Sequence, residues 1–448
     1  MRTSIFLAAA AVIALCVALM QEVHSTPKAE TAKPQPQFLC VHGKSGFWRV
    51  AESPDHIWWF LSPTGRLEFL NTVTTVQPYQ QAGNSSNAGF TSSDWHGDLD
   101  AWARATVQRA GTTYGFKGIG AWSSDALIGH GMPVSRCLNL LDCVPHQFCL
   151  FYSPGWETSL ESAVREQVVP LKDSVDLVGY FTDNERDWSD NGIGPGRYFD
   201  DLRAGDPNRR EVVSVIQQLW QSPSSFSHDW HISLRSWDEL ANRQTLPRQP
   251  EDAYNRLRDA WMQHILARYF SVTTSLIRKY DSNHLILGVR LKGNAPIEVV
   301  RASRAMTDAL SINIYTLDVS TYASTFAMME RESQQPIIVS EFSFHSLDGR
   351  SGNRNISGFP AQVPNQQGRA DSYARFTTDL ARVPGVIGAD WFQWNDEPAT
   401  GRGDGEDANV GIVDIFDHPY ELLVASIGKV TPQLNSLHEH SAVQFDHR

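Results

Sequence analysis

The segment LVGYFTDNE, at residues 177–185, is a short apolar run of β-forming residues that ends abruptly in polar side chains. A second segment, IIVSEFSF at residues 337–344, holds one acidic side chain in an apolar and aromatic setting. Short apolar runs with polar boundaries are typical of buried strands. Each segment therefore predicts a buried strand that delivers a carboxylate at or near its end.

Similar apolar runs recur along the chain, and most of them are separated by stretches with helical periodicity. The runs cover residues 68–76, 114–122, 147–152, 177–182, 285–291, 309–315, 336–344 and 386–394. The clearest intervening helices are predicted at residues 98–110, 160–171, 252–280, 297–306, 321–332 and 371–383. Strands that alternate with helices indicate βα units, and eight such strands predict an α/β fold, the closed (β/α)8 TIM barrel.

Two segments outside this pattern complete the expected architecture. Residues 46–61 are rich in Trp and Phe around Pro54-Asp55, which predicts an antiparallel hairpin that forms a lid on the barrel bottom. Residues 186–250 are rich in Trp, Pro, Asp and Ser and predict a long loop at the C-terminal face, where loops serve the active site. We expect residues 38–448 to form a single catalytic barrel domain that includes the hairpin at 38–62.

The beginning of the chain has the layout of a secretory signal peptide. Arg2 precedes an unbroken apolar run at residues 5–20, and a polar stretch with three prolines follows. The run is shorter than the about 20 residues that a spanning helix needs. We expect a signal peptide at 1–26 and a linker at 27–37, and thus a secreted or periplasmic protein without membrane contact after cleavage. An uncleaved membrane anchor and a lipid on Cys16 are the alternatives.

Charge and cysteine content limit the classes of partner. The formal net charge is −12, from 38 basic and 50 acidic residues, and no dense Lys/Arg stripe is present to neutralise a phosphate backbone. Nucleic acid is therefore not expected as a partner. Four cysteines follow the signal segment, and they could form one or two disulfides or remain buried thiols: Cys40, Cys137, Cys143 and Cys149. The oligomeric state stays open.

Glu185 and Glu341 are the strongest candidates for catalysis. Barrel enzymes place catalytic groups at the C-terminal ends of strands, and the fourth and seventh strands face each other across the barrel mouth. A retaining glycosidase needs two carboxyl groups about 5 to 5.5 Å apart, one protonated and one ionised. The two glutamates can meet that requirement. The alternatives are a helix cap or salt bridge for Glu185 and a structural ion pair for Glu341.

Longer strings in the sequence resemble a known family. GYFTDNE at 179–185 with Trp188 following, SEF at 340–342 with DGR at 348–350, and GADWFQWNDEP at 388–398 are similar to segments of the β-agarases of glycoside hydrolase family 50. GIGAW at 118–122 and DHPY at 417–420 extend the resemblance, which runs from about residue 46 to about residue 426. It implies a clan A retaining glycosidase with Glu185 as acid/base, Glu341 as nucleophile and a galactan-type substrate. Such agarases usually carry an N-terminal carbohydrate-binding sandwich, and none is expected here.

Further residues are expected to bind the sugar. Sugar rings present a flat face of C–H bonds, so aromatic platforms are expected among the tryptophans at strand ends: Trp122, Trp188, Trp391 and Trp394. Of the last two, one should face the cleft, because they lie on opposite faces of a continuous strand. Gln393 and Asp396 are candidates for holding hydroxyl groups. Each tryptophan also fits an ordinary place in the core.

The resemblance adds two expected contacts. It implies that Asn184 contacts the sugar 2-hydroxyl and that Tyr315 donates a hydrogen bond to the nucleophile. An ordinary turn Asn and an ordinary strand Tyr are the alternatives. Arg290 and His345 are further candidates with weaker support.

No metal or cofactor is expected. No His or Cys spacing matches a zinc site, and neither a phosphate-binding glycine loop nor a Gly-x-Ser-x-Gly motif occurs. An acidic loop lacks EF-hand spacing and predicts a solvated turn rather than a calcium site: Asp404, Glu406, Asp407 and Asn409. We predict a retaining hydrolase of β-linked galactose-containing, agar-type polysaccharide or oligosaccharide. The alternatives are a barrel hydrolase of β-glucan or mannan and a non-catalytic carbohydrate-binding barrel.

Overall fold

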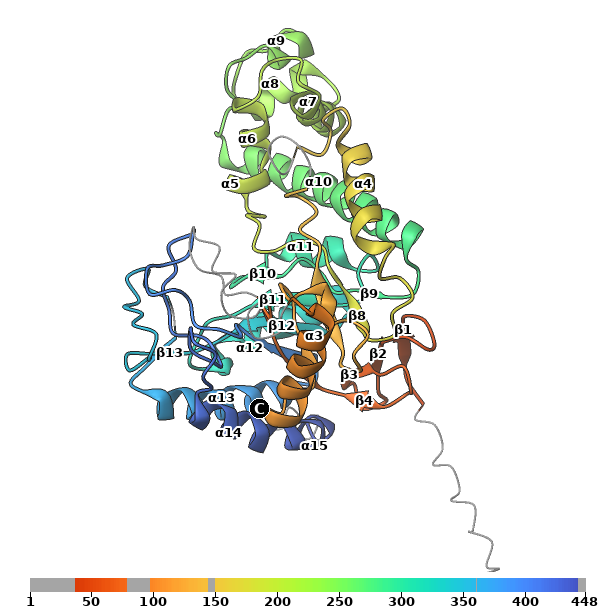
Figure 1. Ribbon diagram of the computed structural model, residues 1–448. Coiled ribbons are helices and arrows are strands. Elements are labelled where there is room, and N and C mark those ends of the chain that lie inside the picture. Colours follow the sequence, from red (N-terminus) through yellow and green to blue (C-terminus); the bar gives the residue numbers. More distant parts are fainter. Residues whose placement is uncertain (1–36, 79–96, 144–149, 360, 442–448) are drawn as a thin grey trace, which may run out of the picture. The chain divides into compact units, whose positions relative to one another are not determined.

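The computed structural model describes residues 37–78, 97–143, 150–359 and 361–441 (Figure 1). The expected signal peptide at 1–26 and all but the last residue of the expected linker lie outside these ranges. The chain divides into the units Met1–Phe38 and Leu39–Arg448, and the second contains every element described below. Within the described ranges, no helix combines the length and the apolar character that crossing a bilayer requires.

A parallel sheet with the strand order β10-β11-β12-β15-β5-β6-β7-β8-β9 forms the centre of the fold. The strands are β5 (Leu70–Val73), β6 (Gly118–Ile119), β7 (Val134–Cys137), β8 (Leu177–Phe181), β9 (Leu285–Ile286), β10 (Leu291–Lys292), β11 (Leu310–Asn313), β12 (Ile337–Phe342) and β15 (Val386–Trp391). β9 and β10 are the two ends of one run, interrupted where Gly288 and Arg290 have positive φ angles. Because β9 pairs with β8 and β10 pairs with β11, this run closes the sheet at its fifth position. The predicted (β/α)8 barrel is confirmed.

Helices surround the barrel and include all six that the sequence predicts (Figure 1). Those six are α3 (Leu99–Gln108), α4 (Trp156–Val168), α10 (Glu251–Tyr280), α11 (Ile297–Ser303), α12 (Ala323–Ser333) and α13 (Gln366–Ala381). Polar caps fix some of their starts: the Asp98 side chain accepts from the N–H of Ala101, and that of Asn365 accepts from the N–H of Gly368. α14 (Glu421–Val430) and α15 (Leu434–Glu439) follow the last strand.

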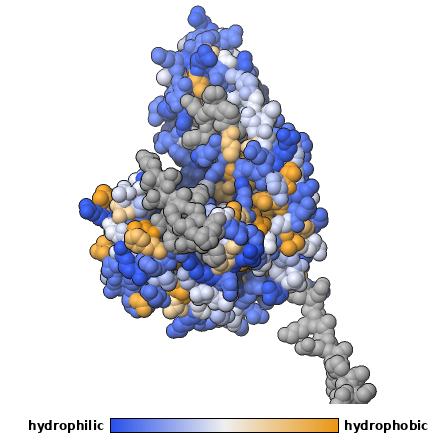
Figure 2. Space-filling view, viewed as in Figure 1, coloured by the Kyte–Doolittle hydropathy of each residue, from blue (hydrophilic) through white to orange (hydrophobic). Residues whose placement is uncertain are grey.

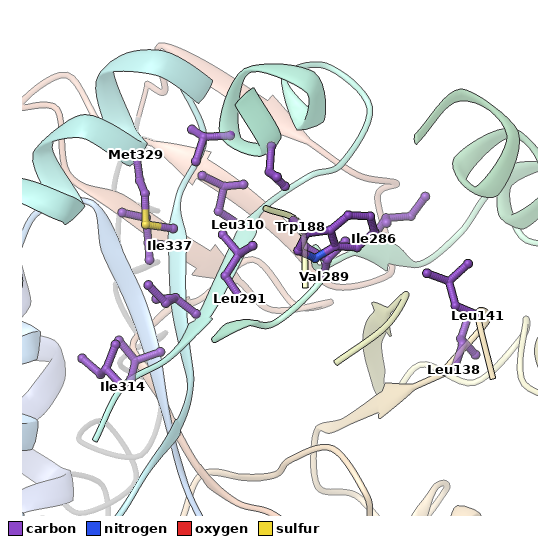
Figure 3. Packing of buried hydrophobic residues seen from close by; sticks show 14 of the residues in the cluster. Leu138, Leu141, Trp188, Ile286, Val289, Leu291, Leu310, Ile314, Met329 and Ile337 are labelled. Atoms are coloured by element: carbon purple, nitrogen blue, oxygen red, sulfur yellow. The ribbon is translucent and has the colours of Figure 1, made fainter. Parts of the chain in front are cut away.

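The main core lies between the barrel strands and these helices. Figure 3 shows part of it, with Leu310 and Ile337 from the strands packed near Met329 from α12. All three side chains are buried. This outer core holds the strands in place from the helix side, while a second apolar cluster fills the barrel interior.

The third strand does not lie where the sequence predicted it. The sequence predicts it at residues 147–152, but β7 is Val134–Cys137. Phe151 and Tyr152 lie in a turn, and residues 147–149 fall outside the described ranges. β7 was missed because it is short and contains Arg136, which forms an ion pair with Asp125. Phe151, which suggested a strand, instead packs between α4 and α10, against Trp156 and Tyr269.

The N-terminal lid is a four-stranded antiparallel sheet, larger than the predicted hairpin. It contains β1 (Cys40–His42), β2 (Arg49–Glu52), β3 (Trp58–Leu61) and β4 (Leu67–Glu68), in that order. Trp48 and Phe60 pack against the N-terminal ends of barrel strands, including Val178 and Ile387. Those ends are the bottom of a barrel, so the predicted position of the lid is confirmed.

Residues 186–250, expected to be a long loop, are largely helical. They form α5 (Asp190–Ile193), α6 (Pro195–Asp200), α7 (Pro207–Trp220), α8 (Pro223–Asp229) and α9 (Trp237–Ala241), which lie near the N-terminal half of α10 (Figure 1). Three of these helices begin with Pro, which suits the first helical position because it needs no N–H there. The visible surface of this helical insertion is mainly hydrophilic (Figure 2).

Candidate active site

Glu341 lies in the barrel because β12 contains a β-bulge. Ile338 packs in the interior cluster, whereas Ile337 and Val339 pack in the outer core, as strand alternation requires. Continued alternation would turn Glu341 outward. Relative to both neighbouring strands, however, β12 has one extra residue between Val339 and Phe342. The bulge turns Glu341 inward and returns Phe342 to the outer core.

Three donors surround the Glu341 carboxylate. The Tyr315 hydroxyl donates to Oε2 at 2.6 Å, and the indole N–H of Trp122 donates to Oε1 at 3.3 Å. The Arg290 guanidinium forms an ion pair with Oε1 at 2.8 Å. Only 7% of the Glu341 side chain is exposed. Donors and a cation around a buried carboxylate stabilise its ionised form.

Arg290 connects several parts of this site. It lies at the interruption between β9 and β10, with φ of 48°, and its side chain is fully buried. Besides the ion pair with Glu341, its guanidinium donates to Asn184 Oδ1 at 2.9 Å and to the Ser340 carbonyl at 2.8 Å. The break in the fifth strand therefore places a buried cation between the ends of β8 and β12.

Asp183 fixes the turn that follows β8. Its carboxylate is fully buried and accepts from the Tyr269 hydroxyl at 2.5 Å and from the N–H of Leu141 at 2.8 Å. Burial raises the pKa of Asp183 to about 7. This carboxylate is an anchor that holds the following residues, Asn184 and Glu185, at the end of the strand.

Glu185 is the second predicted catalytic carboxyl group. Its backbone has φ of 48°, and its N–H donates to the Arg290 carbonyl at 3.0 Å. Oε1 accepts from Asn313 Nδ2 at 3.0 Å, and Lys292 Nζ lies 3.9 Å from Oε2. Burial raises the pKa of Glu185, and the nearby Glu341 carboxylate raises it further. The two glutamates therefore interact, and the protonated form of Glu185 is favoured.

Asn184 and Gln393 are both predicted to bind substrate. They differ in which side-chain atom is left to contact a ligand. Asn184 Oδ1 accepts from Arg290 and from Asn313, so its amide Nδ2 is the group that can donate to a ligand. Gln393 is buried, and among the described residues its Oε1 accepts no hydrogen bond. An unsatisfied buried acceptor is costly unless another group supplies a donor.

Three of the four predicted tryptophan platforms are buried in the outer core. Trp188 packs on Tyr269 with ring centroids 4.9 Å apart and lies near Val289 (Figure 3). Trp391 has no exposed surface, and the Arg109 guanidinium lies 4.8 Å from a ring centroid of Trp394. The expectation that one of the last two faces the cleft is wrong, because β15 ends at Trp391 and the chain bends beyond it. Of the four predicted tryptophans, Trp122 lies at the site and donates to Glu341.

Asp396, a predicted hydroxyl-binding residue, is used inside the protein. Its buried carboxylate accepts from the hydroxyls of Ser351 at 2.7 Å and Tyr420 at 2.5 Å, from Asn409 Nδ2 at 2.9 Å, and from the N–H of Gly411 at 2.8 Å. These contacts join loops around the C-terminal end of β15. The structure thus assigns Asp396 a structural role and does not bring it to the glutamates.

Asn313 and Asp390 belong to the site but were missed in the sequence. Asn313 ends β11 and contacts both Glu185 and Asn184. Asp390 is buried beside Arg290 and Glu341, and burial raises its pKa to about 7. Asp390 could have been found by the same sequence feature as Glu341, because it too is an acidic residue inside an apolar strand. Asn313 carried none, because an Asn at the end of a strand is common in turns.

The Arg402 side chain holds the acidic loop together. Arg402 forms ion pairs with Glu397, Asp404 and Glu406, and Asp407 accepts from the N–H of Ile356 at 3.0 Å. Burial raises the pKa of Glu397 to about 8. In the parts of the chain that the structure describes, no group of His, Cys, Asp and Glu side chains is arranged to hold a metal ion.

The cysteines are thiols where the structure describes them. Cys40, Cys137 and Cys143 are unbridged, and Cys149 lies outside the described residues. Burial raises the pKa of the Cys137 thiol to about 12. Cys137 therefore stays protonated and acts as a small apolar side chain.

No protein-family model matches the chain. Among curated proteins it is similar to β-agarase A of Vibrio sp. (strain JT0107), with 27% identity over 364 residues, covering 73% of this chain and 35% of that protein. It is also similar to β-agarase B of the same organism, with 26% identity over 293 residues, covering 62% of this chain and 29% of that protein. The chain thus spans about a third of the length of the curated relatives it matches.

Solved structures share the fold. An exo-β-agarase structure has a TM-score of 0.74 with 19% identity, and the match covers 95% of this chain and 70% of that one. An agarase structure has a TM-score of 0.72, also at 19% identity, with the same coverage. A β-galactosidase from Halorubrum lacusprofundi follows at 0.55, with 13% identity, 82% of this chain and 58% of that one. In sequence the chain is similar to β-agarases, and it shares its fold with solved agarase structures.

Proposed function

We propose that this protein is a retaining glycoside hydrolase that cleaves β-linked, agar-type galactan, with Glu341 as nucleophile and Glu185 as acid/base. The observation that carries the proposal is the contrast between the two carboxyl groups. Arg290, Tyr315 and Trp122 stabilise the charge on Glu341, whereas burial and the Glu341 charge favour the protonated form of Glu185. A double displacement needs one group of each kind.

In the first step, a Glu341 carboxylate oxygen attacks the anomeric carbon while the bond to the glycosidic oxygen breaks. That oxygen takes the proton of Glu185 and leaves as a hydroxyl group. In the second step, the Glu185 carboxylate removes a proton from water, whose oxygen attacks the same carbon and breaks the ester bond to Glu341. Two inversions retain the configuration of the anomeric carbon.

The surrounding residues supply binding and orientation. Asn184 Nδ2 can donate to a sugar hydroxyl because Asn184 Oδ1 already accepts two hydrogen bonds. Trp122 and Tyr315 combine an aromatic ring with a donor to Glu341, and Gln393 Oε1 supplies a buried acceptor. We assign substrate binding to these four residues.

The roles of the glutamates can be separated with variants. Glu341→Gln should abolish turnover of every substrate, because no glycosyl-enzyme can form. Glu185→Ala should retain the first step for substrates with a good leaving group, and added azide should restore turnover by replacing water. Azide rescue of Glu185→Ala with inversion of the product would mean that the two roles are exchanged. Glu330→Gln, at a half-buried carboxyl group on α12, is the matched control and should retain activity.

The identity of the glycan needs a substrate panel. The sequence similarity to β-agarases favours agar-type galactan over β-glucan or mannan. Agarose, porphyran, galactan, β-glucan and mannan oligosaccharides should be compared by kcat/KM. Cleavage of β-glucan or mannan alone would contradict the proposed substrate. Binding without cleavage of any of them would favour a non-catalytic carbohydrate-binding barrel.

We also propose export from the cytoplasm, on the basis of the apolar run at residues 5–20 behind Arg2. An external polysaccharide is too large to enter the cytoplasm intact, so export also fits the proposed substrate. Fractionation of expressing cells with mass determination of the N-terminus tests this. Uncleaved protein that remains in the cytoplasm would contradict it.

A further inference from the structure

Asn313 joins the surroundings of the two glutamates. It is the last residue of β11, and the bulge in β12 brings it level with Glu341 in the register. Its Nδ2 donates to Glu185 Oε1 at 3.0 Å and to Asn184 Oδ1 at 3.2 Å. Its Oδ1 accepts from the Ser340 hydroxyl at 2.7 Å. Only 1% of Asn313 is exposed, so water does not compete for these contacts.

The orientation of the Asn313 amide is determined by its neighbours. Asn184 Oδ1 is an acceptor because the Arg290 guanidinium, which can only donate, points at it. The group of Asn313 that faces Asn184 must therefore be the NH₂ group. The Ser340 hydroxyl then donates to the opposite end of the amide. Rotation of the amide would place an oxygen against two acceptors.

This orientation makes the two oxygens of Glu185 unequal. Oε1 accepts the amide N–H, and a carbonyl-like or ionised oxygen accepts better than the hydroxyl oxygen of a protonated carboxyl group. The proton of the neutral carboxyl group is therefore better placed on Oε2. We propose that Asn313, held by Ser340, is a positioning residue that assigns the catalytic proton to Glu185 Oε2. Oε2 is then the atom that faces the glycosidic oxygen.

The inference rests on the proposed function, because it concerns the acid of the proposed mechanism. Other charged groups near Glu185 act differently. Glu341 on β12, Arg290 just before β10 and Lys292 on β10 all change the pKa of Glu185. The ion pair with Lys292 is long, however, and the Lys292 side chain is 74% exposed. An exposed flexible cation shifts a pKa without fixing the rotation of a carboxyl group. Lys292 therefore offers a matched comparison.

The test compares two kinds of substrate with Asn313→Ala. An agar-type oligosaccharide needs a proton on its leaving oxygen, whereas an aryl β-galactoside with a strongly acidic phenol does not. Glu185 becomes charged as it gives up its proton, so loss of a hydrogen bond to that carboxylate should lower kcat/KM for the oligosaccharide about 10- to 100-fold. The aryl substrate should lose less than about threefold, because kcat/KM reports only steps through the first cleavage.

Two further variants distinguish positioning from other effects. Ser340→Ala keeps the Asn313 amide but removes the hydroxyl that holds it. It should therefore lower kcat/KM for the oligosaccharide by a smaller factor than Asn313→Ala does, and leave kcat/KM for the aryl substrate unchanged. Lys292→Met should move the alkaline limb of the pH profile upward without changing the ratio between the two substrates, because that lysine lowers the pKa of Glu185. Asn242→Ala, at the exposed C-cap of α9, controls for the substitution itself.

The outcomes are distinct. Equal losses on both substrates in Asn313→Ala and in Ser340→Ala would mean that Asn313 supports the site as a whole, and would overturn the inference. Unchanged oligosaccharide cleavage in Asn313→Ala would also overturn it. If the unmodified protein cleaves neither substrate, the proposed function fails first. If Asn313→Ala does not fold, Ser340→Ala alone decides: a lower ratio of kcat/KM for the oligosaccharide to kcat/KM for the aryl substrate supports the inference, and an unchanged ratio overturns it.

Discussion

Replacing Tyr315 by Phe removes one donor from the proposed nucleophile and little else. The ring packs at right angles to Phe359 and Phe392, with centroids 4.9 and 6.4 Å away, and a Phe ring keeps these contacts. The hydroxyl donates to Glu341 Oε2 at 2.6 Å. Burial and the neighbouring carboxylate raise the pKa of Tyr315 well above its ordinary value, so the hydroxyl remains a donor throughout the working pH range.

The size of the effect follows from the charge on Glu341. A hydrogen bond to a charged group contributes about 1.5 to 3 kcal/mol, or about 10- to 100-fold in rate. The donor matters most in the second step, because Glu341 leaves a neutral ester and regains its charge there. Tyr315→Phe should therefore lower kcat by this factor on an activated aryl β-galactoside and lower KM as well, since the glycosyl-enzyme accumulates.

Burst kinetics and intact-protein mass spectrometry check this expectation. The variant should show an initial burst of phenol and a mass increase of one glycosyl unit, and both should vanish in Glu341→Gln. Tyr322→Phe is the control, because that tyrosine lies in the short helix η3 (Val319–Tyr322) and packs on Phe326. A normal kcat in Tyr315→Phe, or a loss of activity without accumulation of the intermediate, would refute the reasoning.

Three other substitutions have expected outcomes. Trp122→Phe removes the longer 3.3 Å hydrogen bond to Glu341 and should lower kcat less than Tyr315→Phe does; the reverse order would contradict the assigned geometry. Asp390 has a pKa raised from 3.8 to about 7, so the fold loses stability as pH rises through that range; the Tm of Asp390→Asn relative to the unmodified protein should rise between about pH 4 and about pH 7 in scanning calorimetry and level off above, and a constant difference across that range would count against it. Gly179→Ala would place a Cβ 2.3 Å from the Leu285 carbonyl oxygen between β8 and β9, so its Tm should fall clearly, and an unchanged Tm would show that the strands can separate there.

Much of the fold was accessible from local sequence patterns. The long helix α10 and the strand β8 were predicted within a residue or two, because helical periodicity and a bounded apolar run depend only on neighbouring residues. β7 was missed because its four residues include Arg136, which is paired with Asp125 outside the strand. The helical insertion was taken for a loop because Pro and Ser at helix starts resemble loop residues when read alone.

In the candidate site, too, some features follow from local sequence and others only from tertiary structure. The sequence by itself determined the barrel class and singled out the two glutamates as candidates, because a carboxylate in or after an apolar run stands out locally. Tertiary structure alone decided that a bulge turns Glu341 inward, that Arg290 and Asn313 meet the glutamates, and that Trp188 lies in the core. The physical reason is that a side chain's direction and partners depend on strand register and on residues far away in the chain, which no local pattern contains.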